Sequence, residues 1–344
     1  MTTSGRWRKR PEGSNWGEFG PDDQLGRLNL VTSERTRAGL AEAVNGQVFS
    51  LSLPLDVPRT NALNPRRHPP MLRPTLRGDR PNFNCCPAPG VASDVVCDDL
   101  VILHTQYSTQ WDALSHMGQL FDTDDDGVAE MVYYNGFRAD IDIVGPKSIA
   151  GAGISGEMRS TSSAMRLGIE NMAVHGVQGR GVMIDLRRHF GDQSLSIGWK
   201  ELSSVLQADG IVVEPGDMVC FHTGFADRLL ASATGVGLEN CCASIDGSDP
   251  DLLDWITNSG LSVMAADNYA VETIPTRNPK PGGANAPLHE HCLFKLGIHL
   301  GELWWLTPLA HWLHENRRSR FLLTAPPLRL PGAVGSPVTP IATV

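Results

Sequence analysis

The chain has 344 residues, of which 41% are hydrophobic and 19% are charged, so it can bury a sizeable core. Its net charge of −9 argues against binding to the phosphate backbone of nucleic acids. No apolar run is long enough to span a membrane, the basic N-terminus lacks the apolar core of a signal peptide, and the seven cysteines follow no disulfide or CxxC pattern. We therefore expect a cytoplasmic protein with reduced thiols.

The first 94 residues are predicted to precede the core as an N-terminal extension. Within them, Ser33–Val44 has the pattern of a helix that Ser33 could cap, and Val48–Leu53 alternates like a half-buried strand. Residues 54–94 show almost no periodicity and predict a long loop that faces either solvent or an anionic substrate. Its arginines are Arg66, Arg67, Arg73, Arg77 and Arg80.

Residues 95–344 alternate between short apolar runs and helix-like stretches. The predicted buried strands are Val101–His104, Val182–Leu186, Met218–His222, Leu261–Ala265 and Arg320–Leu323. The predicted helices are Ser162–Val174, Gly198–Asp209, Pro250–Ser259 and Trp304–Asn316. Strands that alternate with single helices predict one α/β domain over residues 1–344.

The first segment whose residue types could serve catalysis or metal binding runs from His104 to His116 and follows a predicted strand. Asp112 and His116 are four residues apart, so they would share one face of a helix. A carboxylate beside an imidazole is the minimum for general-base catalysis or metal ligation. A purely structural Asp–His pair would show the same spacing.

A second polar motif, Asp122–Gly127, begins like an EF-hand calcium loop, with acidic residues at the first, third and fifth positions. Tyr133 stands where that loop needs a glutamate. The sequence favours a polar hairpin turn and leaves a structural calcium ion open.

The segment around Asp112 resembles the HxGTHxDxPxH signature of the cyclase family, whose metal-dependent hydrolases include bacterial kynurenine formamidase and isatin hydrolase. Thr109, Asp112 and His116 match the signature, whereas Gln106 and Gln110 replace its first two histidines. Later segments resemble further motifs of the family in the same order. They are Gln178–Asp185, Val213–Asp217, Phe221–Gly224, Ala266–Glu272, Pro287–His289, Gly297–Glu302, Pro327–Gly332 and Gly335–Pro337.

This resemblance implies a swivelling β/β/α fold with a mixed sheet or barrel-like core and flanking helices. It also implies a hydrolase that opens an amide, lactam or related cyclic carbonyl bond of a small-molecule substrate, with a lactone as an alternative, and a homodimer or homotetramer. Carried over by position, Asp112, His289 and Glu302 would hold one divalent ion, manganese or zinc, and His116 would move the proton. Because amides replace two imidazoles, zinc affinity should fall and the preference should move toward manganese or magnesium.

Two other interpretations stay open. In a metal-free cyclase or lyase, His116 paired with Asp112 would be the base, and Gln106 and Gln110 would donate hydrogen bonds to an oxyanion. In a non-catalytic binding protein, the fold would persist without turnover. The residues predicted to contact substrate are Gln106, Gln110, Trp111, His222 and Tyr134, with a place in the core as the alternative for the last three.

Overall fold

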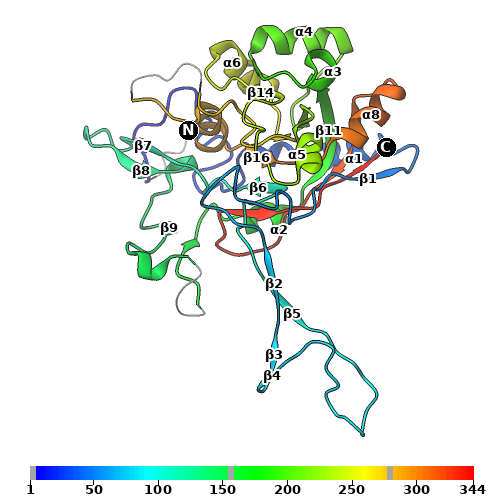
Figure 1. The fold of residues 1–344 in the computed structure, drawn as a ribbon. Helices are drawn as coiled ribbons and strands as arrows, with labels where there is room; N and C mark the ends of the chain where they lie inside the picture. Colours follow the sequence, from blue (N-terminus) through cyan, green and yellow to red (C-terminus); the bar gives the residue numbers. More distant parts are fainter. Residues whose placement is uncertain (1–4, 154–158, 277–281) are drawn as a thin grey trace.

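The structure is a computed structural model that describes residues 5–153, 159–276 and 282–344. Its described strands include nine that form one curled, mixed sheet in the order β1-β19-β17-β11-β13-β15-β16-β6-β18 (Figure 1). The parallel centre consists of β11 (Gln178–Asp185), β13 (Met218–His222), β15 (Val263–Ala266) and β16 (His299–Glu302). The prediction of an α/β fold with a mixed sheet is confirmed.

Antiparallel strands extend the sheet on both sides of this centre. On one side lie β17 (Arg320–Thr324), β19 (Ile341–Thr343) and β1 (Val48–Ser50). On the other side lie β6 (Gln110–Asp112) and β18 (Gly335–Pro337). Segments from the beginning, middle and end of the sequence therefore meet in one sheet.

Helices connect the parallel strands and cover the sheet (Figure 1). They are α1 (Ser33–Leu40), α2 (Glu170–His175), α3 (Leu186–Phe190), α4 (Trp199–Asp209), α5 (Phe225–Ser232), α6 (Pro250–Ser259), α7 (Pro287–His289) and α8 (Thr307–Glu315), with the π-helix η4 (Glu290–Leu296) after α7. Shorter 3-10 turns are η1 (Gly26–Leu30), η2 (Tyr134–Gly136) and η3 (Ile149–Gly151). None of the helices in the described ranges has the length and apolar character to cross a membrane.

Helix boundaries agree with the sequence where local signals are strong. The predicted Pro250–Ser259 helix is correct, because Asp249 caps it and Gly260 ends it in a left-handed conformation. The first helix ends four residues earlier than predicted, and Thr32 caps it instead of Ser33. The predicted helix Ser162–Val174 is wrong in its first half, which contains a short strand.

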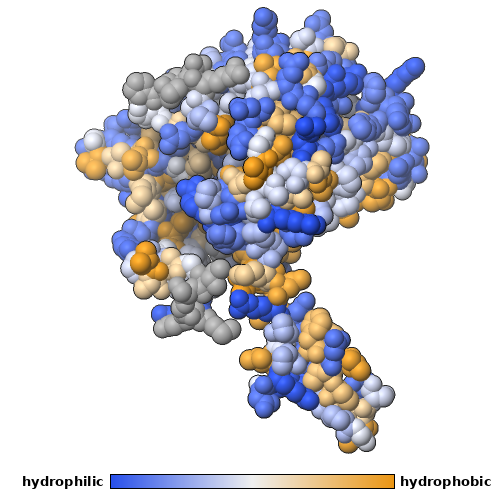
Figure 2. Space-filling view, viewed as in Figure 1, coloured by the Kyte–Doolittle hydropathy of each residue, from blue (hydrophilic) through white to orange (hydrophobic). Residues whose placement is uncertain are grey.

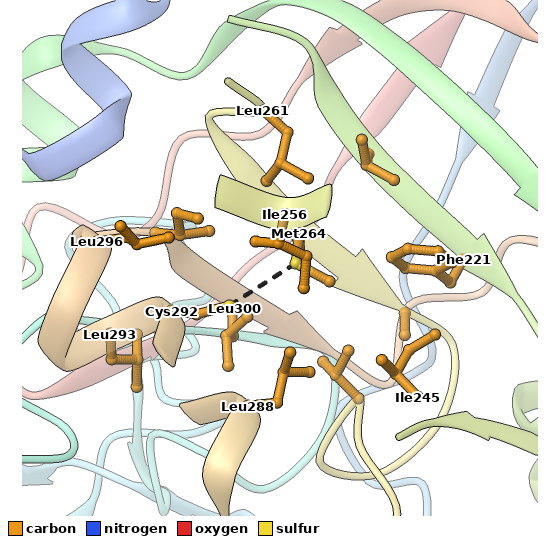
Figure 3. Packing of buried hydrophobic residues seen from close by; sticks show 14 of the residues in the cluster. Phe221, Ile245, Ile256, Leu261, Met264, Leu288, Cys292, Leu293, Leu296 and Leu300 are labelled. Carbon is orange, nitrogen blue, oxygen red and sulfur yellow. Dashed lines mark hydrogen bonds between the residues drawn. The ribbon is translucent and has the colours of Figure 1, made fainter. Parts of the chain in front are cut away.

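Hydrophobic side chains fill both faces of the sheet. On one face, Phe221 and Met264 pack with Ile256 of α6 and with Leu288 and Cys292 (Figure 3). Each such side chain contributes about 1.5–3 kcal/mol when it is fully removed from water. The core thus anchors the segment that carries α7 to the centre of the sheet.

The other face is anchored by two tryptophans. The rings of Trp111 and Trp304 meet edge to face, with centroids 4.9 Å apart. Gly301 allows this approach, because a Cβ there would lie only 3.0 Å from the Trp111 ring and 2.8 Å from Trp304 Nε1. The contact between the two rings holds β6 against β16.

Residues 54–94 and the predicted strand Val101–His104 differ from expectation. They contribute to a long ribbon that projects from the rest of the molecule (Figure 1). Its strands are β2 (Met71–Pro74), β3 (Leu76–Arg77), β4 (Arg80–Pro81) and β5 (Asp99–Ile102). The region is therefore not structureless, and β5 is largely exposed rather than buried. The apolar residues of Val101–His104 indicate a strand, but they do not indicate that its partner β2 is exposed as well.

Three further strand pairs lie outside the main sheet. They are β7 (Gln119–Phe121) with β8 (Glu130–Val132), β9 (Ile143–Val144) with β10 (Ser163–Ala164), and β12 (Leu195–Ile197) with β14 (Ala243–Ile245). The first pair makes the acidic motif a hairpin turn, as predicted. Asp122 accepts hydrogen bonds there from the backbone of Asp126 and Gly127.

Candidate active site

The pairing of β6 with β16 brings polar side chains together inside the sheet. Gln110 lies directly opposite Glu302 in this antiparallel pair. Asp112 lies two residues along β6 and therefore shares a face with Gln110. His289, the last residue of α7, reaches the same place.

Asp112, His289 and Glu302 form a buried cluster. One ligand atom from each lies within 4.8 Å of the others. The His289 Nε2 atom is 3.5 Å from Glu302 Oε1 and 3.9 Å from Asp112 Oδ2. Both oxygens of Asp112 are buried and accept no hydrogen bond from the described residues. A buried carboxylate without donors is costly, so this donor set fits a bound cation.

Glu272 orients the imidazole of this cluster. Its Oε1 atom accepts a hydrogen bond of 2.6 Å from His289 Nδ1, and its two oxygens also accept from the backbone N–H groups of Leu288 and His289. The proton on Nδ1 is thereby fixed, and Nε2 is directed toward Asp112 and Glu302. A carboxylate behind a histidine is a common feature of metal sites in proteins.

The charges in the cluster depend on one another. Burial raises the pKa of Asp112, and the neighbouring Glu302 adds to this effect. Burial alone would lower the pKa of His289, but hydrogen bonding and charge from Glu272 and Glu302 raise it to about 10. The imidazolium thus neutralises its carboxylate neighbours when no other cation is present. A divalent cation between these side chains would take over that role.

His116 lies at the edge of the buried cluster, with its side chain 21% exposed. The Gln106 Nε2 atom lies 2.8 Å from His116 Nδ1, and the Gln106 Oε1 atom accepts a hydrogen bond from Thr105. The amide is therefore oriented to donate to Nδ1, which places the proton of the neutral imidazole on Nε2. That atom lies 3.9 Å from Asp112 Oδ1.

The predicted helical relationship between Asp112 and His116 is wrong. Asp112 ends a strand, and the chain then turns so that the His116 N–H group donates to the Ala113 carbonyl. The tight turn brings the two side chains together although no helix forms.

Gln110 and Gln106 have different partners. The Gln110 Nε2 atom donates to Glu302 Oε2 at 3.1 Å, and its Oε1 atom is buried with no hydrogen-bond donor among the described residues. Each of the two amide nitrogens therefore already donates to a side chain of the site. Gln110 also places an oxygen without a donor beside Glu302.

Three residues predicted to contact substrate lie elsewhere. Trp111 and Tyr134 are fully buried in the hydrophobic core. Trp111 points away from the polar cluster, because successive side chains of a strand alternate between faces. His222 is buried between Asp185 (2.8 Å) and Thr307 (2.9 Å), which matches the alternative of a hydrogen-bonded core histidine.

Sequence reasoning assigned no role to Glu272 or Tyr269 and left Arg67 undecided between solvent and substrate. Arg67 donates a hydrogen bond of 2.7 Å to the carbonyl of Gln106, and its charge acts on both Asp112 and Glu302. Burial, followed by the charge of Glu302, raises the pKa of Tyr269. Glu272 could have been found as the last residue of a family-like motif, whereas the position of Arg67 depends on the path of the loop.

Comparison with known proteins identifies relatives of this architecture. Residues 49–273 match the profile of the Cyclase family. A solved structure described as a novel cyclase is 32% identical, with a TM-score of 0.72 over 96% of this chain and 97% of that chain. Isatin hydrolase A from Ralstonia solanacearum is 14% identical, with a TM-score of 0.53 over 89% of this chain and 94% of that chain. None of the curated proteins compared with this chain matches it.

Isatin hydrolase A from Labrenzia aggregata, solved with benzyl benzoate, is a further structural neighbour. It is 12% identical, with a TM-score of 0.55 over 90% of this chain and 99% of that chain. At these identities the two isatin hydrolases show a shared fold.

Proposed function

Because this chain belongs to the cyclase family, we propose that it is a metal-dependent hydrolase that opens an amide, lactam or related cyclic carbonyl bond with water. The observation that carries the proposal is the buried carboxylate of Asp112, which accepts no hydrogen bond from any residue that the structure describes and faces His289 and Glu302. The names of the isatin hydrolases support a carbon–nitrogen bond in a ring as the target.

The metal would be held by Asp112, His289 and Glu302, and the Gln110 oxygen is a candidate fourth ligand. When bound, a divalent ion lowers the pKa of water and polarises a carbonyl group. A set of two carboxylates, one amide oxygen and one imidazole favours manganese or magnesium over zinc.

His116 would handle the proton of the reaction. Its Nε2 atom lies 3.9 Å from Asp112, so the ring would take up the proton that the attacking water loses and pass it to a departing nitrogen or oxygen. Gln106 orients the ring through Nδ1, and Arg67 holds the backbone of Gln106. The metal-free alternative needs amide N–H groups that are free to bind an oxyanion. Gln106 Nε2 already donates to His116 and to the Val334 carbonyl, and Gln110 keeps only one N–H beyond its bond to Glu302, which makes this alternative the weaker candidate.

The test combines metal analysis with a substrate panel. The purified protein should bind one equivalent of Mn²⁺, and at least one amide, lactam or lactone should be hydrolysed in a reaction that chelation stops and Mn²⁺ restores. Full turnover by metal-free protein would contradict the metal proposal. Binding of panel compounds without any turnover would instead favour a binding protein. The cytoplasmic location and the homo-oligomeric state also stay predictions.

A further inference from the structure

Two cysteines that are neighbours in the sequence bring their sulfur atoms into contact. The Sγ atoms of Cys241 and Cys242 lie 3.0 Å apart, and both thiols are free. A disulfide bond is about 2.0 Å long, so these atoms are about 1 Å from bonding distance. Neither cysteine belongs to the candidate metal cluster, so the pair is a second group of reactive side chains in the molecule.

The backbone of Cys242 explains why the two sulfurs meet. Its φ angle is 67°, in the left-handed region that residues with a Cβ rarely adopt. In an extended strand, neighbouring side chains point to opposite faces, whereas this turn directs both thiols to the same side. The surroundings hold the turn, because the Cys242 N–H group donates to the Asp192 carbonyl at 3.1 Å and the side chain is only 3% exposed.

The chain contains a second adjacent pair, Cys85 and Cys86, which serves as an internal comparison. Cys85 forms an isolated β-bridge, and the Cys86 Sγ atom contacts the carbonyl of Ala92 at 3.6 Å. No hydrogen bond joins these two thiols in the part of the chain that the structure describes. The pair lies in the ribbon of residues 71–102, which stands clear of the rest of the molecule (Figure 2). Adjacency in the sequence is therefore not enough, because the local backbone decides whether the thiols meet.

The two thiols in contact differ in their access to solvent. Cys241 is partly exposed, whereas Cys242 is buried in the hydrophobic cluster that includes Phe225 and Leu229. Burial raises the pKa of the Cys242 thiol, and the hydrogen bond with Cys241 adds to this effect. Because the thiolate is the nucleophile, a dissolved oxidant reacts first with Cys241, and Cys242 closes the bond.

The position of the pair indicates a reactive bond and not a structural one. A disulfide stabilises a protein mainly by closing a loop of the unfolded chain, and the loop between adjacent residues contains no other residue. The gain in stability is therefore minimal. Strained disulfides have higher reduction potentials than structural ones, and in reducing compartments such bonds are usually transient and redox-sensing.

We propose that Cys241 and Cys242 form a reversible disulfide, with a low-molecular-weight disulfide, oxidised glutathione, as the oxidant. The Cys241 thiolate attacks one sulfur of oxidised glutathione, which breaks that S–S bond, forms a mixed disulfide and releases one glutathione thiolate. Cys242 then loses its proton, attacks the Cys241 sulfur and expels the second glutathione thiolate. Two electrons and two protons thus pass from the cysteine pair to oxidised glutathione, which becomes two thiols.

The test is mass spectrometry of the folded full chain after incubation with oxidised glutathione. Free thiols are blocked with N-ethylmaleimide, and the protein is then digested without reduction. The peptide that contains both cysteines should escape blocking and weigh about 2 Da less than its dithiol form, and dithiothreitol should restore it. C242S should keep a glutathione adduct of about 305 Da on Cys241, because the thiol that would displace glutathione is absent. The matched control is C85S/C86S/C97S, which should still form the bond.

Blocking of both Cys241 and Cys242 in the folded, glutathione-treated chain would overturn the proposal, as would a disulfide from either residue to another cysteine. A bond that forms only after unfolding in urea would overturn it as well. In C241S, an adduct on Cys242 would contradict the proposed order of attack. The measurement on the unmodified chain does not require any variant to fold. It also needs neither metal nor hydrolytic activity, so its outcome is separate from that of the proposed function.

Discussion

Glu272 determines how His289 faces the other members of the candidate metal site. It accepts hydrogen bonds from the Nδ1 and backbone N–H groups of His289, so it fixes both the position and the tautomer of the ring. The same carboxylate raises the pKa of His289 against the effect of burial. Glu272 thus sets both the basicity of the His289 imidazole and the direction in which its Nε2 atom points.

E272Q should therefore weaken metal binding. Glutamine has nearly the same shape, but it removes the negative charge that makes the imidazole a strong ligand. The dissociation constant for Mn²⁺, measured by isothermal titration calorimetry, should rise by about 10–100-fold. E290Q is the control, because Glu290 follows His289 directly but pairs with Lys295 at 3.5 Å. Equal affinity in E272Q and the unmodified protein would show that Glu272 does not support the metal.

H116A should separate proton transfer from metal binding. His116 contacts Gln106 and lies at the edge of the cluster, outside the three candidate ligands. Its loss should lower kcat by about 10²–10⁴-fold on any substrate found, with little change in Mn²⁺ affinity. H175A, which alters an exposed histidine of α2, should keep normal kcat. A normal kcat in H116A would remove this residue from the chemistry.

At the residue scale, the sequence predicted the cluster only through the family resemblance. Asp112, His289 and Glu302 are far apart in the chain, and no local pattern links them. The roles of the two substituted amides could not be read from the sequence, because Gln106 faces His116 while Gln110 faces Glu302. That difference depends on the three-dimensional surroundings of each side chain.

At the scale of elements, one charged network ties the first helix to the sheet. Arg180 of β11 contacts Asp217 (2.8 Å) and Glu214 (3.0 Å), and Arg35 of α1 contacts the same Glu214 oxygen at 2.7 Å. These hydrogen bonds, first from Arg35 and then from Arg180, lower the pKa of Glu214 to about 2. The network holds α1 against β11, with which it is in contact.

A pKa that is lower in the folded state means that the ionised Glu214 stabilises the fold. The contribution is present above the unfolded pKa of 4.5 and is lost as the pH falls through the folded value of about 2. E214Q should thus lower the free energy of unfolding near neutral pH by about 1 kcal/mol or less, because the side chain is partly exposed to screening solvent. Urea unfolding should show the difference shrinking as the pH falls over this range.

E315Q serves as the control for this measurement, because Glu315 is exposed at the end of α8. It should differ little from the unmodified protein at every pH. A constant difference between E214Q and the unmodified protein down to the lowest pH would contradict the assigned role of the network.

Elements with local signals were predicted well, and elements defined by distant partners were not. The run Met218–His222 is β13 as predicted, because consecutive apolar residues describe a strand buried on both faces. The ribbon of residues 71–102 was missed, because Met71 pairs with Ile102 across the 30 residues 72–101, which carry no period. Burial and pairing of a strand depend on its neighbours as well as on its own residues.

At the scale of the whole molecule, the candidate site links distant parts of the chain. Its side chains come from β6, α7 and β16, and β18 pairs with β6 beside them. An ion bound to the folded state and not to the unfolded state would therefore stabilise the entire sheet.

Mn²⁺ should raise the melting temperature of the protein. At a free concentration of 100 times Kd, one site adds about 2.7 kcal/mol to the free energy of unfolding. Differential scanning calorimetry with and without Mn²⁺ measures the effect. The shift should persist in D126N, which disrupts the cluster Asp122, Asp124 and Asp126 in the exposed turn. If D126N abolished the shift, the ion would bind in that turn and not at Asp112.

The sequence by itself determined the α/β class, the positions of three central strands and, through its motifs, membership of the cyclase family. These properties follow from local periodicity, turn residues and the order of short motifs, all of which can be read from the sequence without knowing which distant residues are in contact. Only the tertiary structure decided that Trp111, Tyr134 and His222 lie away from the cluster, that Glu272 supports His289, and that residues 71–102 form an exposed arm. The physical reason is that burial, hydrogen bonding and charge depend on neighbours that the fold brings together from distant positions.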